Sequence, residues 1–200
     1  QWINSLTELP DHEIVVSSSG MFYLGGFTSS LLFKIDASGH VPLAKSFSYP
    51  FQSFNDLFGF TPMNGKYYSV LITGPTNFLI EMDSDFVTSA LYEGLWSLTR
   101  SGSPVIIPQV LAGTNNELLL FSSGYCMAGK LQRINLSTLS NTVQDVFMSM
   151  NGLATTPAGG YLLSGNGPLC VVRSIPGTSP HLGLICEDST GFSPGCISQS

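Results

Sequence analysis

Charge is what this sequence of 200 residues has least of. Charged residues make up 10% of the chain, and seven Lys and Arg stand against thirteen Asp and Glu, for a net charge of −6. Nucleic acids and anionic membrane surfaces are both bound through clustered basic side chains. The composition therefore argues against nucleic acid and against membrane attachment as partners. Solubility must come from hydroxyl and amide groups, which suits an extracellular or cell-surface location.

Long apolar runs are missing as well. No stretch approaches the roughly 18 uninterrupted apolar residues of a membrane-spanning helix, so we expect no membrane insertion. Hydrophobic residues nevertheless make up 43% of the chain, and this content is too high for a disordered protein. A chain of this length is long enough for one domain with a sizeable core. We therefore expect residues 1–200 to form a single domain or a fragment of one.

The familiar catalytic and metal-binding motifs are also absent. His12 lies in "DHE", but an HExxH zinc motif needs a second His where Val16 stands. The segment "YLLSG" at 161–165 lacks the leading Gly of a nucleophile elbow. The "DSD" at 83–85 offers oxygen atoms, but the remaining ligands of a calcium loop are missing. We therefore predict no catalytic residue, no metal site and no cofactor.

What the sequence does contain is a pattern of strands that recurs four times. Each copy has an apolar strand that closes on Gly, followed nine to eleven residues later by the end of an alternating strand. The four alternating strands are "LLFKID" to Asp36, "FLIEMD" to Asp83, "KLQRIN" to Asn135 and "CVVRSIP" to Pro176. Such regular offsets indicate an internal repeat.

Two further strands complete each copy. One of them precedes the Gly-closing strand. In the first copy this preceding strand is at 12–20 and the Gly-closing strand at 20–26. The other follows the Asp or Asn turn, and in the last copy it is "HLGLIC" at 181–186. The segment 1–6 fits the outermost strand of a further blade, and "GFSPGCISQS" at 191–200 fits the start of another. We therefore expect four strands in each repeat unit.

The repeat predicts an all-β fold. Four-stranded antiparallel units at this period are typical of β-propeller blades, whose stacking covers both faces of each sheet. We predict about four such blades, in a closed ring or in an arc of a larger propeller. A two-sheet sandwich is the alternative, although it gives no reason for a repeated four-strand register. The predicted repeat units are 7–53, 54–104, 105–147 and 148–190.

Four cysteines are present, and none forms a CxxC pair or has a His at metal spacing, which argues against zinc. An even count in a chain that looks non-cytosolic favours disulfides. Cys186 and Cys196 bracket a Gly/Pro turn, whereas Cys126 and Cys170 hold similar places in successive repeats. We expect these two pairs as disulfides, with buried free thiols as the alternative.

The stretch "GGFTSSLLFKIDASGHVPLAKSF" at 25–47 resembles a known group of repeats. In degenerate β-propeller repeats of secreted and surface proteins of Bacteroidota-like bacteria, "GGY-apolar-x-G" is followed by "LLKLD-x-x-G-N-V-x-W-x-K-x-F". The resemblance covers most of the chain but is close only in the first unit, and Pro176 stands where the acid belongs in the fourth. These motif residues are structural in the family. The resemblance therefore implies an extracellular scaffold or binding module and transfers no catalytic residue.

The function predicted from the sequence is a non-enzymatic binding or scaffold module for adhesion or for glycan or protein recognition. Tyr49 and Phe51 belong to an aromatic cluster between the first two units, and Trp96 and Arg100 lie in the long connection 93–108. Aromatic and Arg side chains on such loops suit a protein or glycan partner. One alternative is a propeller hydrolase or lyase with a site in the channel, although the inner-strand segments carry almost no acids or His. Another is a structural component of a phage or surface appendage.

Overall fold

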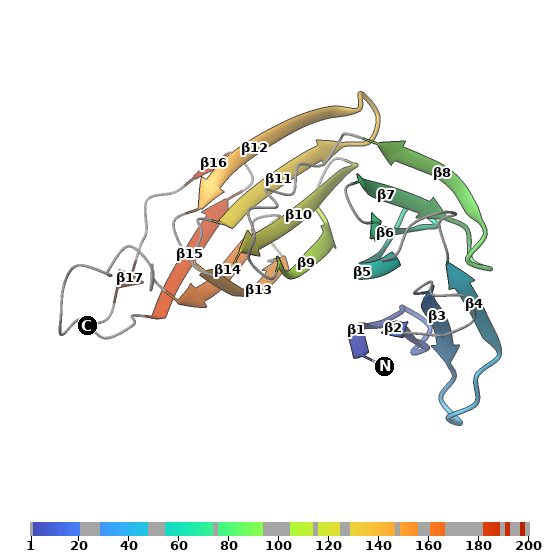
Figure 1. Ribbon diagram of the computed structural model, residues 1–200. Helices are drawn as coiled ribbons and strands as arrows, with labels where there is room; N and C mark the ends of the chain where they lie inside the picture. Colours follow the sequence, from blue (N-terminus) through green and yellow to red (C-terminus); the bar gives the residue numbers. More distant parts are fainter. Residues whose placement is uncertain are drawn as a thin grey trace. The chain divides into compact units, whose positions relative to one another are not determined.

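A computed structural model gives the fold of the chain (Figure 1). The residues that it describes are 2–20, 29–47, 55–73, 76–93, 105–113, 116–124, 129–146, 149–155, 161–166, 182–188, 191–192 and 197–198. Every regular element in these ranges is a β-strand. They contain no helix of the length and hydrophobicity needed to span a membrane.

Gln1–Leu98 form a first compact unit that holds two antiparallel sheets of four strands each. In both sheets, strands that follow one another in the chain lie side by side. The first sheet consists of β1 (Trp2–Glu8), β2 (Ile14–Gly20), β3 (Ser29–Ile35) and β4 (Leu43–Phe47). The second consists of β5 (Asn55–Met63), β6 (Lys66–Thr73), β7 (Thr76–Met82) and β8 (Thr88–Glu93).

Thr99–Ser200 form a second compact unit, again with two antiparallel sheets. Its first sheet consists of β9 (Val105–Ala112), β10 (Glu117–Gly124), β11 (Gly129–Asn135) and β12 (Ser140–Val146), in chain order. Its second sheet consists of β13 (Ser149–Thr155), β14 (Tyr161–Asn166), β15 (Leu182–Asp188), β16 (Gly191–Phe192) and β17 (Ile197–Ser198). Both β16 and β17 pair with β15.

The predicted all-β fold is confirmed, with three antiparallel sheets of four strands, whereas the described strands of the last sheet number five. The closed propeller ring and the boundaries of the repeat units stay predictions. In the middle of the chain the strand positions also match the prediction, since "DLFGFTPMNG" at 56–65 contains most of β5 and "FLIEMD" contains most of β7.

The strand order predicted for the first sheet is wrong. The segment 12–20 is not the first strand, because β1 (Trp2–Glu8) pairs with it along its length. β2 pairs directly with β3, with Gly20 opposite Ser29, and the strand predicted at 20–26 lies, apart from Gly20, outside the described residues. The described residues 2–6 of the segment 1–6 are therefore part of this sheet and do not form the outer strand of another blade. A tight turn in which the Leu9 N–H donates to the Glu13 carbonyl at 2.8 Å joins β1 to β2.

Two predictions for the last sheet are also wrong. Residues 182–186 of the predicted fourth strand lie in β15, which pairs directly with β14 and is thus the third strand of its sheet and not the fourth. The described residues of the segment 191–200 do not begin another blade, because β16 and β17 both pair with β15. The third strand predicted at 170–176 lies outside the described residues.

The turns that follow β3, β7 and β11 are built in the same way. In each, the side-chain oxygen of an Asp or Asn accepts hydrogen bonds from two backbone N–H groups just ahead in the chain. This arrangement explains why the sequence places Asp or Asn at the end of the alternating strand. The bonds reach Asp36 from Ser38 and His40 (2.8 and 2.9 Å), Asp83 from Asp85 and Val87 (both 2.9 Å), and Asn135 from Ser137 and Thr138 (2.9 and 3.1 Å).

Each of these three turns contains one residue with left-handed backbone geometry. In the first sheet this residue is Gly39, with φ of 82°, which suits the conformation because Gly has no Cβ. In the other two turns, side-chain-bearing residues adopt it, Phe86 with φ of 58° and Leu139 with φ of 54°. Phe86 is buried in the core, whereas Leu139 is 46% exposed. Core packing thus offsets the strain at Phe86 but not at Leu139.

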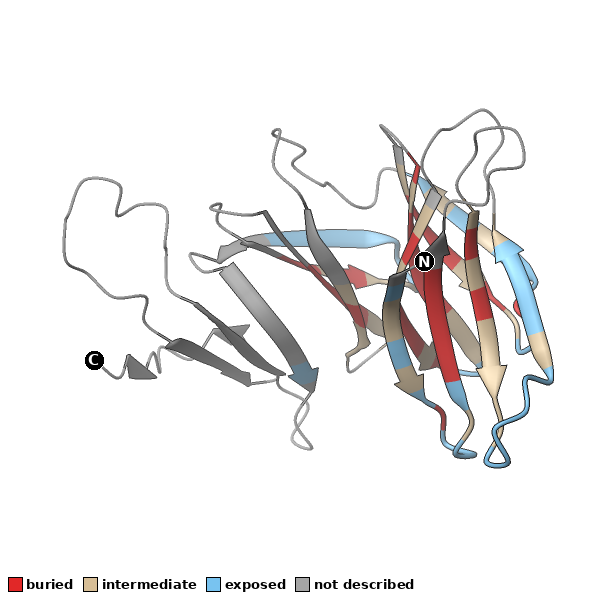
Figure 2. Cartoon of the chain, turned by 60° about the horizontal axis from the view of Figure 1, so that its bottom comes forward, coloured by how far each residue is buried: buried red, intermediate tan, exposed pale blue. Residues whose placement is uncertain are grey.

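The core of the first unit lies between its two sheets. Val15 and Leu32 from the first sheet meet Leu57, Leu71 and further apolar side chains of the second. Exposed residues lie at the turns and on the last strands of the two sheets, β4 and β8, as Figure 2 shows. Polar side chains also join the two sheets. The Asn4 amide donates to the Leu57 carbonyl at 2.8 Å, the Thr7 hydroxyl to the Phe60 carbonyl at 2.9 Å, and the Leu57 N–H to the Ser30 hydroxyl at 2.8 Å.

Candidate functional site

The second sheet of the first unit has two faces with different roles. Phe78, Ile80 and Met82 point from β7 into the core between the sheets. Side chains alternate between the two faces of a strand, so Glu81 projects from the opposite face. Its register partner on β6 is Tyr68, and Tyr92 on β8 lies opposite Leu79 of β7, on the same side as Glu81. We call Glu81 and its four polar neighbours, Lys66, Tyr68, Ser89 and Tyr92, the Glu81 cluster.

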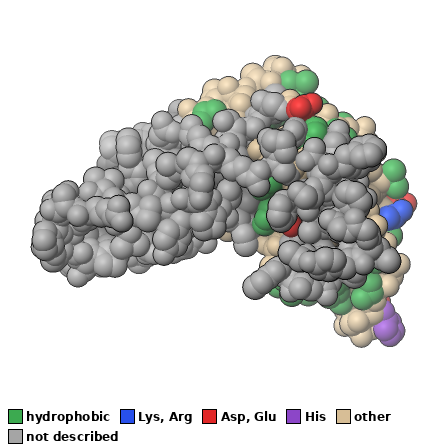
Figure 3. Space-filling model, viewed as in Figure 1, with side chains coloured by type: hydrophobic (Ala, Val, Ile, Leu, Met, Phe, Trp, Pro, Cys, Tyr) green, Lys and Arg blue, Asp and Glu red, His purple; other side chains and the backbone are tan. Residues whose placement is uncertain are grey.

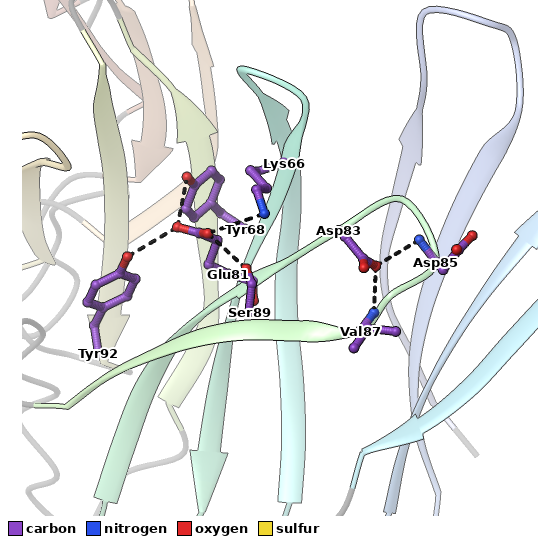
Figure 4. Close-up of polar contacts among 8 residues, drawn as sticks. All are labelled: Lys66, Tyr68, Glu81, Asp83, Asp85, Val87, Ser89 and Tyr92. Atoms are coloured by element: carbon purple, nitrogen blue, oxygen red, sulfur yellow. Dashed lines mark hydrogen bonds and ion pairs between the residues drawn. The ribbon is translucent and has the colours of Figure 1, made fainter.

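The Glu81 carboxylate stands at the centre of this cluster (Figure 4). Its Oε2 atom accepts hydrogen bonds from the hydroxyls of Tyr68 at 3.3 Å and Tyr92 at 3.1 Å. Its Oε1 atom accepts one from the Ser89 hydroxyl at 2.8 Å and lies 3.7 Å from the Lys66 ammonium nitrogen. The side chain of Glu81 is 18% exposed and that of Lys66 40%, so the cluster reaches the surface.

The cluster keeps Glu81 ionised. Burial opposes ionisation of Glu81 and is the largest single influence on it. The hydrogen bonds from Ser89, Tyr92 and Tyr68 and the charge of Lys66 together outweigh burial and lower the pKa of Glu81 below its ordinary value. Burial and the neighbouring Glu81 raise the pKa of both Tyr68 and Tyr92. These phenols therefore stay protonated and act as donors to the carboxylate.

A charged side chain occupies the same place in the first sheet. In the aligned strands "LLFKID" and "FLIEMD", Lys34 corresponds to Glu81, and its ammonium nitrogen lies 3.4 Å from a carboxylate oxygen of Glu13. Lys34 is 12% exposed and lies 5.6 Å from the ring centroids of both Tyr67 and Phe86. Each sheet of the first unit thus holds one ion pair at this position. The third strand supplies the cation, Lys34, in the first sheet and the anion, Glu81, in the second.

The chemistry open to Glu81 follows from this environment. A general acid needs a raised pKa, and a nucleophile needs an accessible lone pair. Glu81 has a lowered pKa, and its oxygens already accept three hydroxyls. It therefore acts as an anionic acceptor that orients hydroxyl groups.

Asp56 is the other carboxylate on the Glu81 side of this sheet. It lies on β5 opposite Ile72, and Ile72 lies opposite Asn77 of β7. Asp56 is thus two strands across the sheet and four residues along β7 from Glu81, a separation of about 16 Å at ordinary sheet spacings. The carboxyl pairs of glycosidases lie about 5 to 9.5 Å apart. Asp56 and Glu81 therefore do not form such a pair with each other.

The side chains that the sequence predicted for partner binding, Tyr49, Phe51, Trp96 and Arg100, lie outside the described residues. Cys126, Cys170 and Cys196 lie outside them too, and of Cys186 only its backbone place in β15, opposite Leu162, is described. The two disulfides therefore stay predictions. Within the described ranges, no three His, Cys, Asp or Glu side chains come together as metal ligands would.

The Glu81 cluster was not among the sites predicted from the sequence. A signal was present, because the fourth position of the alternating strand is charged in three repeats, as Lys34, Glu81 and Arg133. All three side chains are half-buried, and a charge at such a position usually has a partner. The partners come from neighbouring strands and turns, which a strand-by-strand analysis does not combine.

The chain matches no known family model and no curated protein. It is similar in fold to solved structures, among them a protein of unknown function from Bacteroides caccae, with a TM-score of 0.60 and 15% identity over 98% of this chain and 67% of the other. Another is a GH43 glycoside hydrolase engineered to show both endo-xylanase and exo-arabinofuranosidase activity, with a TM-score of 0.56 and 12% identity. A third is described as a glycoside hydrolase, with a TM-score of 0.53 and 12% identity.

The chain spans only part of the two glycoside hydrolases. The likeness covers 94% and 100% of this chain but 38% and 50% of theirs. At such low identity these likenesses establish the fold: an all-β chain of antiparallel four-stranded sheets, shared with propeller-type enzymes. They also correct the expectation of a non-enzymatic scaffold or binding module, because two of the similar structures are enzymes.

Proposed function

We propose that the chain belongs to a propeller-type glycoside hydrolase that acts on a polysaccharide. The observation that carries the proposal is the likeness in fold to two glycoside hydrolases over nearly the whole of this chain. A hydrolase with its site in the channel also fits the chain better than the binding module first expected. An extracellular or cell-surface location, proposed from the charge-poor composition, would bring such an enzyme to its substrate.

The first strand of each sheet is where we look for the reacting groups. In a propeller these strands surround the central channel. Two described carboxylates lie on such strands, Glu8 at the end of β1 and Asp56 near the start of β5. Glu8 is exposed, and its Oε1 atom lies 2.9 Å from Nδ1 of His12. Asp56, in contrast, is half-buried. The charge of a half-buried carboxyl group acts through surroundings that are less polar than water and so has a larger effect, and we therefore propose Asp56 as one of the two catalytic carboxyl groups.

The substrate should carry little charge. The chain has a net charge of −6, and charged side chains are few on the described surface visible in Figure 3. Two of its described lysines are already paired, Lys34 with Glu13 and Lys66 with Glu81, and Lys45 on β4 is exposed. Polyanionic polysaccharides would therefore be repelled. Neutral polysaccharides such as xylan and arabinan are the substrates to test.

The test is release of reducing ends from these polysaccharides by the purified protein. We expect hydrolysis by the wild type and a loss of about 100-fold or more in kcat for Asp56→Asn, because removal of an acid–base group costs at least that much. Asp85→Asn is the matched control, since Asp85 lies exposed in the β7–β8 turn.

Two results would contradict the proposal, each in a different part. If the folded wild-type protein releases no reducing ends from any of these substrates, the proposed hydrolase activity is wrong. If the wild type is active and Asp56→Asn retains full activity, only the assignment of Asp56 is wrong. Circular dichroism of each variant verifies that the sheets are intact.

A further inference from the structure

Leu57 follows Asp56 directly on β5, and the first sheet holds both of its backbone groups. The Leu57 N–H donates to the Ser30 hydroxyl on β3 at 2.8 Å, and the Leu57 carbonyl accepts from the Asn4 amide on β1 at 2.8 Å. The Leu57 side chain is fully buried in the core between the two sheets. The residue next to Asp56 is therefore fastened to the first sheet at three points.

The two hydrogen bonds also fix the backbone of Asp56. A peptide group is planar from one Cα atom to the next, so the Leu57 N–H lies in one plane with the Asp56 Cα atom. The bond from this N–H to Ser30 therefore holds the Asp56 Cα atom as well. Asn4 holds the following peptide plane through the Leu57 carbonyl. Two consecutive planes with fixed orientations set the direction of β5 at Asp56.

The position of the Asp56 carboxyl group follows from this backbone. Successive side chains of a strand point to opposite faces, so the Asp56 side chain points away from the face on which Leu57 is buried. A shift of the Leu57 backbone against the first sheet would carry the Asp56 carboxyl group with it. Catalytic groups need to be held within about 0.5 Å of their productive position. Contacts that fix the neighbouring backbone are thus able to govern the reaction.

A bond of the same kind lies further along β5 and serves as a comparison. The Thr7 hydroxyl on β1 donates to the Phe60 carbonyl at 2.9 Å. Phe60 lies in the β-bulge at 58–61, where the register of β5 with β6 shifts. A bulge interrupts the pairing of a strand locally, so a displacement of Phe60 is not carried along the paired strands to Asp56. Thr7 therefore joins the same two strands as Asn4 without fixing Asp56.

We infer that Asn4 and Ser30 are positioning residues for the Asp56 carboxyl group. Both act through the Leu57 backbone, so their influence on the reaction is the place that they give to this carboxyl group. The catalytic consequence rests on the proposed function. The positioning itself is a property of the first unit and is open to measurement without a substrate.

Two variants that each remove one side-chain donor test the inference. Asn4→Leu replaces the amide by an apolar group of similar shape, and Thr7→Val does the same for the hydroxyl. We expect Asn4→Leu to lower kcat on neutral polysaccharides by about 10-fold or more, because a small misplacement of a reacting group costs up to about 100-fold. KM should stay within about twofold, since the lost interaction acts on the chemical step. Ser30→Ala should behave in the same way, whereas Thr7→Val should keep kcat within about twofold.

A second measurement needs no hydrolysis. The carboxyl carbon of Asp56 gives a ¹³C NMR resonance, which Asp56→Asn assigns by its loss. We expect this resonance to move in Asn4→Leu and in Ser30→Ala and to stay in place in Thr7→Val. Thermal unfolding shows which variants are folded, and Asn4→Ala, with a smaller side chain, takes the place of Asn4→Leu if the leucine does not fit.

Three results would overturn the inference. In the first, the Asp56 resonance stays in place in Asn4→Leu and in Ser30→Ala. In the second, it moves equally in Thr7→Val, which would show a general loosening of the contact between the sheets. In the third, the wild type is active and Asn4→Leu keeps its kcat although the resonance moves. If the wild type releases no reducing ends, the proposed function fails, and the resonance alone decides whether Asn4 and Ser30 position Asp56.

Discussion

The hydroxyl of Ser30 on β3 accepts a hydrogen bond of 2.8 Å from the backbone N–H of Leu57 on β5. Both residues are fully buried, and the bond crosses from one sheet to the next. An edge strand exposes N–H groups that need partners. The Ser30 side chain thus supplies the hydrogen-bond acceptor that a neighbouring strand would otherwise supply to the Leu57 N–H. The bond also fixes where β5 lies on the first sheet.

Removing this hydroxyl should destabilise the first unit. We expect Ser30→Ala to lower the free energy of unfolding by about 1 to 3 kcal/mol, because the buried Leu57 N–H loses its partner. Ser46→Ala, an exposed position on β4, should change it by less than about 0.5 kcal/mol. Urea unfolding of both variants measures the difference. Equal stability of the two variants would show that the bond contributes nothing.

The left-handed residue of the β11–β12 turn offers a stabilising change. Leu139 has φ of 54° and is 46% exposed, so its side chain loses little when it is removed. We expect Leu139→Gly to raise stability by about 1 kcal/mol, because Gly adopts this conformation without the Cβ clash. The reverse change in the first sheet, Gly39→Ala, should cost a similar amount through backbone conformation alone, since a Cβ there meets nothing within 4 Å. Thermal unfolding of both variants checks the two signs together.

The same turn position in the second sheet should respond in the opposite direction. Phe86 also has a left-handed backbone, but it is 2% exposed, with ring centroids 5.8 Å from Phe60 and 5.9 Å from Tyr67. Loss of a buried Phe ring costs about 3 to 5 kcal/mol, more than the relief of strain returns. We therefore expect Phe86→Gly to destabilise the protein by about 2 to 4 kcal/mol. A denaturation midpoint equal to or above that of the wild type would refute this ranking of packing over strain.

Glu81 should make the fold sensitive to acid. Its pKa is lowered in the folded state, so its ionised form contributes stability above the ordinary pKa of 4.5, and this contribution is lost as pH falls through the lowered value. Glu81→Gln has no charge to lose. We expect the wild type to lose more stability than this variant between neutral pH and pH 3. Unfolding curves at several pH values measure the loss, with Asp85→Asn as a control in an exposed turn. Parallel curves for the wild type and Glu81→Gln would exclude a role for Glu81.

The sequence predicted the fold class because the turn chemistry is local. Asp36, Asp83 and Asn135 each close their turn with a side chain that bonds to backbone only two to four residues ahead. The positions of β7 and its neighbouring strands could therefore be predicted from a few consecutive residues. The Asn64–Gly65 hairpin, with φ of 53° and 72°, is local in the same sense.

The wrong predictions concern strands whose place in the sheet is decided by pairing with residues distant in the sequence. Ile14–Gly20 has the alternation of either a first or a second strand, and only its pairing with Trp2–Glu8 makes it the second. Leu182–Asp188 likewise becomes a third strand only through its pairing with β14. The Glu81 cluster escaped prediction for the same reason, because Lys66, Tyr68 and Tyr92 reach Glu81 from two other strands. The likeness in fold to glycoside hydrolases could not be predicted either, since no local sequence motif marks it.

Each sheet of four is made of strands that succeed one another along the chain. A ribosome therefore releases all four strands of the first sheet before it has synthesised β5, and the sheet can assemble while translation continues. The faces of this sheet are covered only when a neighbouring sheet has formed, whereas the pairing of its own four strands needs no other sheet. The same order means that duplication or deletion of one repeat in the gene adds or removes an entire sheet and leaves the path of the remaining chain unaltered. Proteins of this kind can then differ in size while the order of strands in each remaining sheet stays the same.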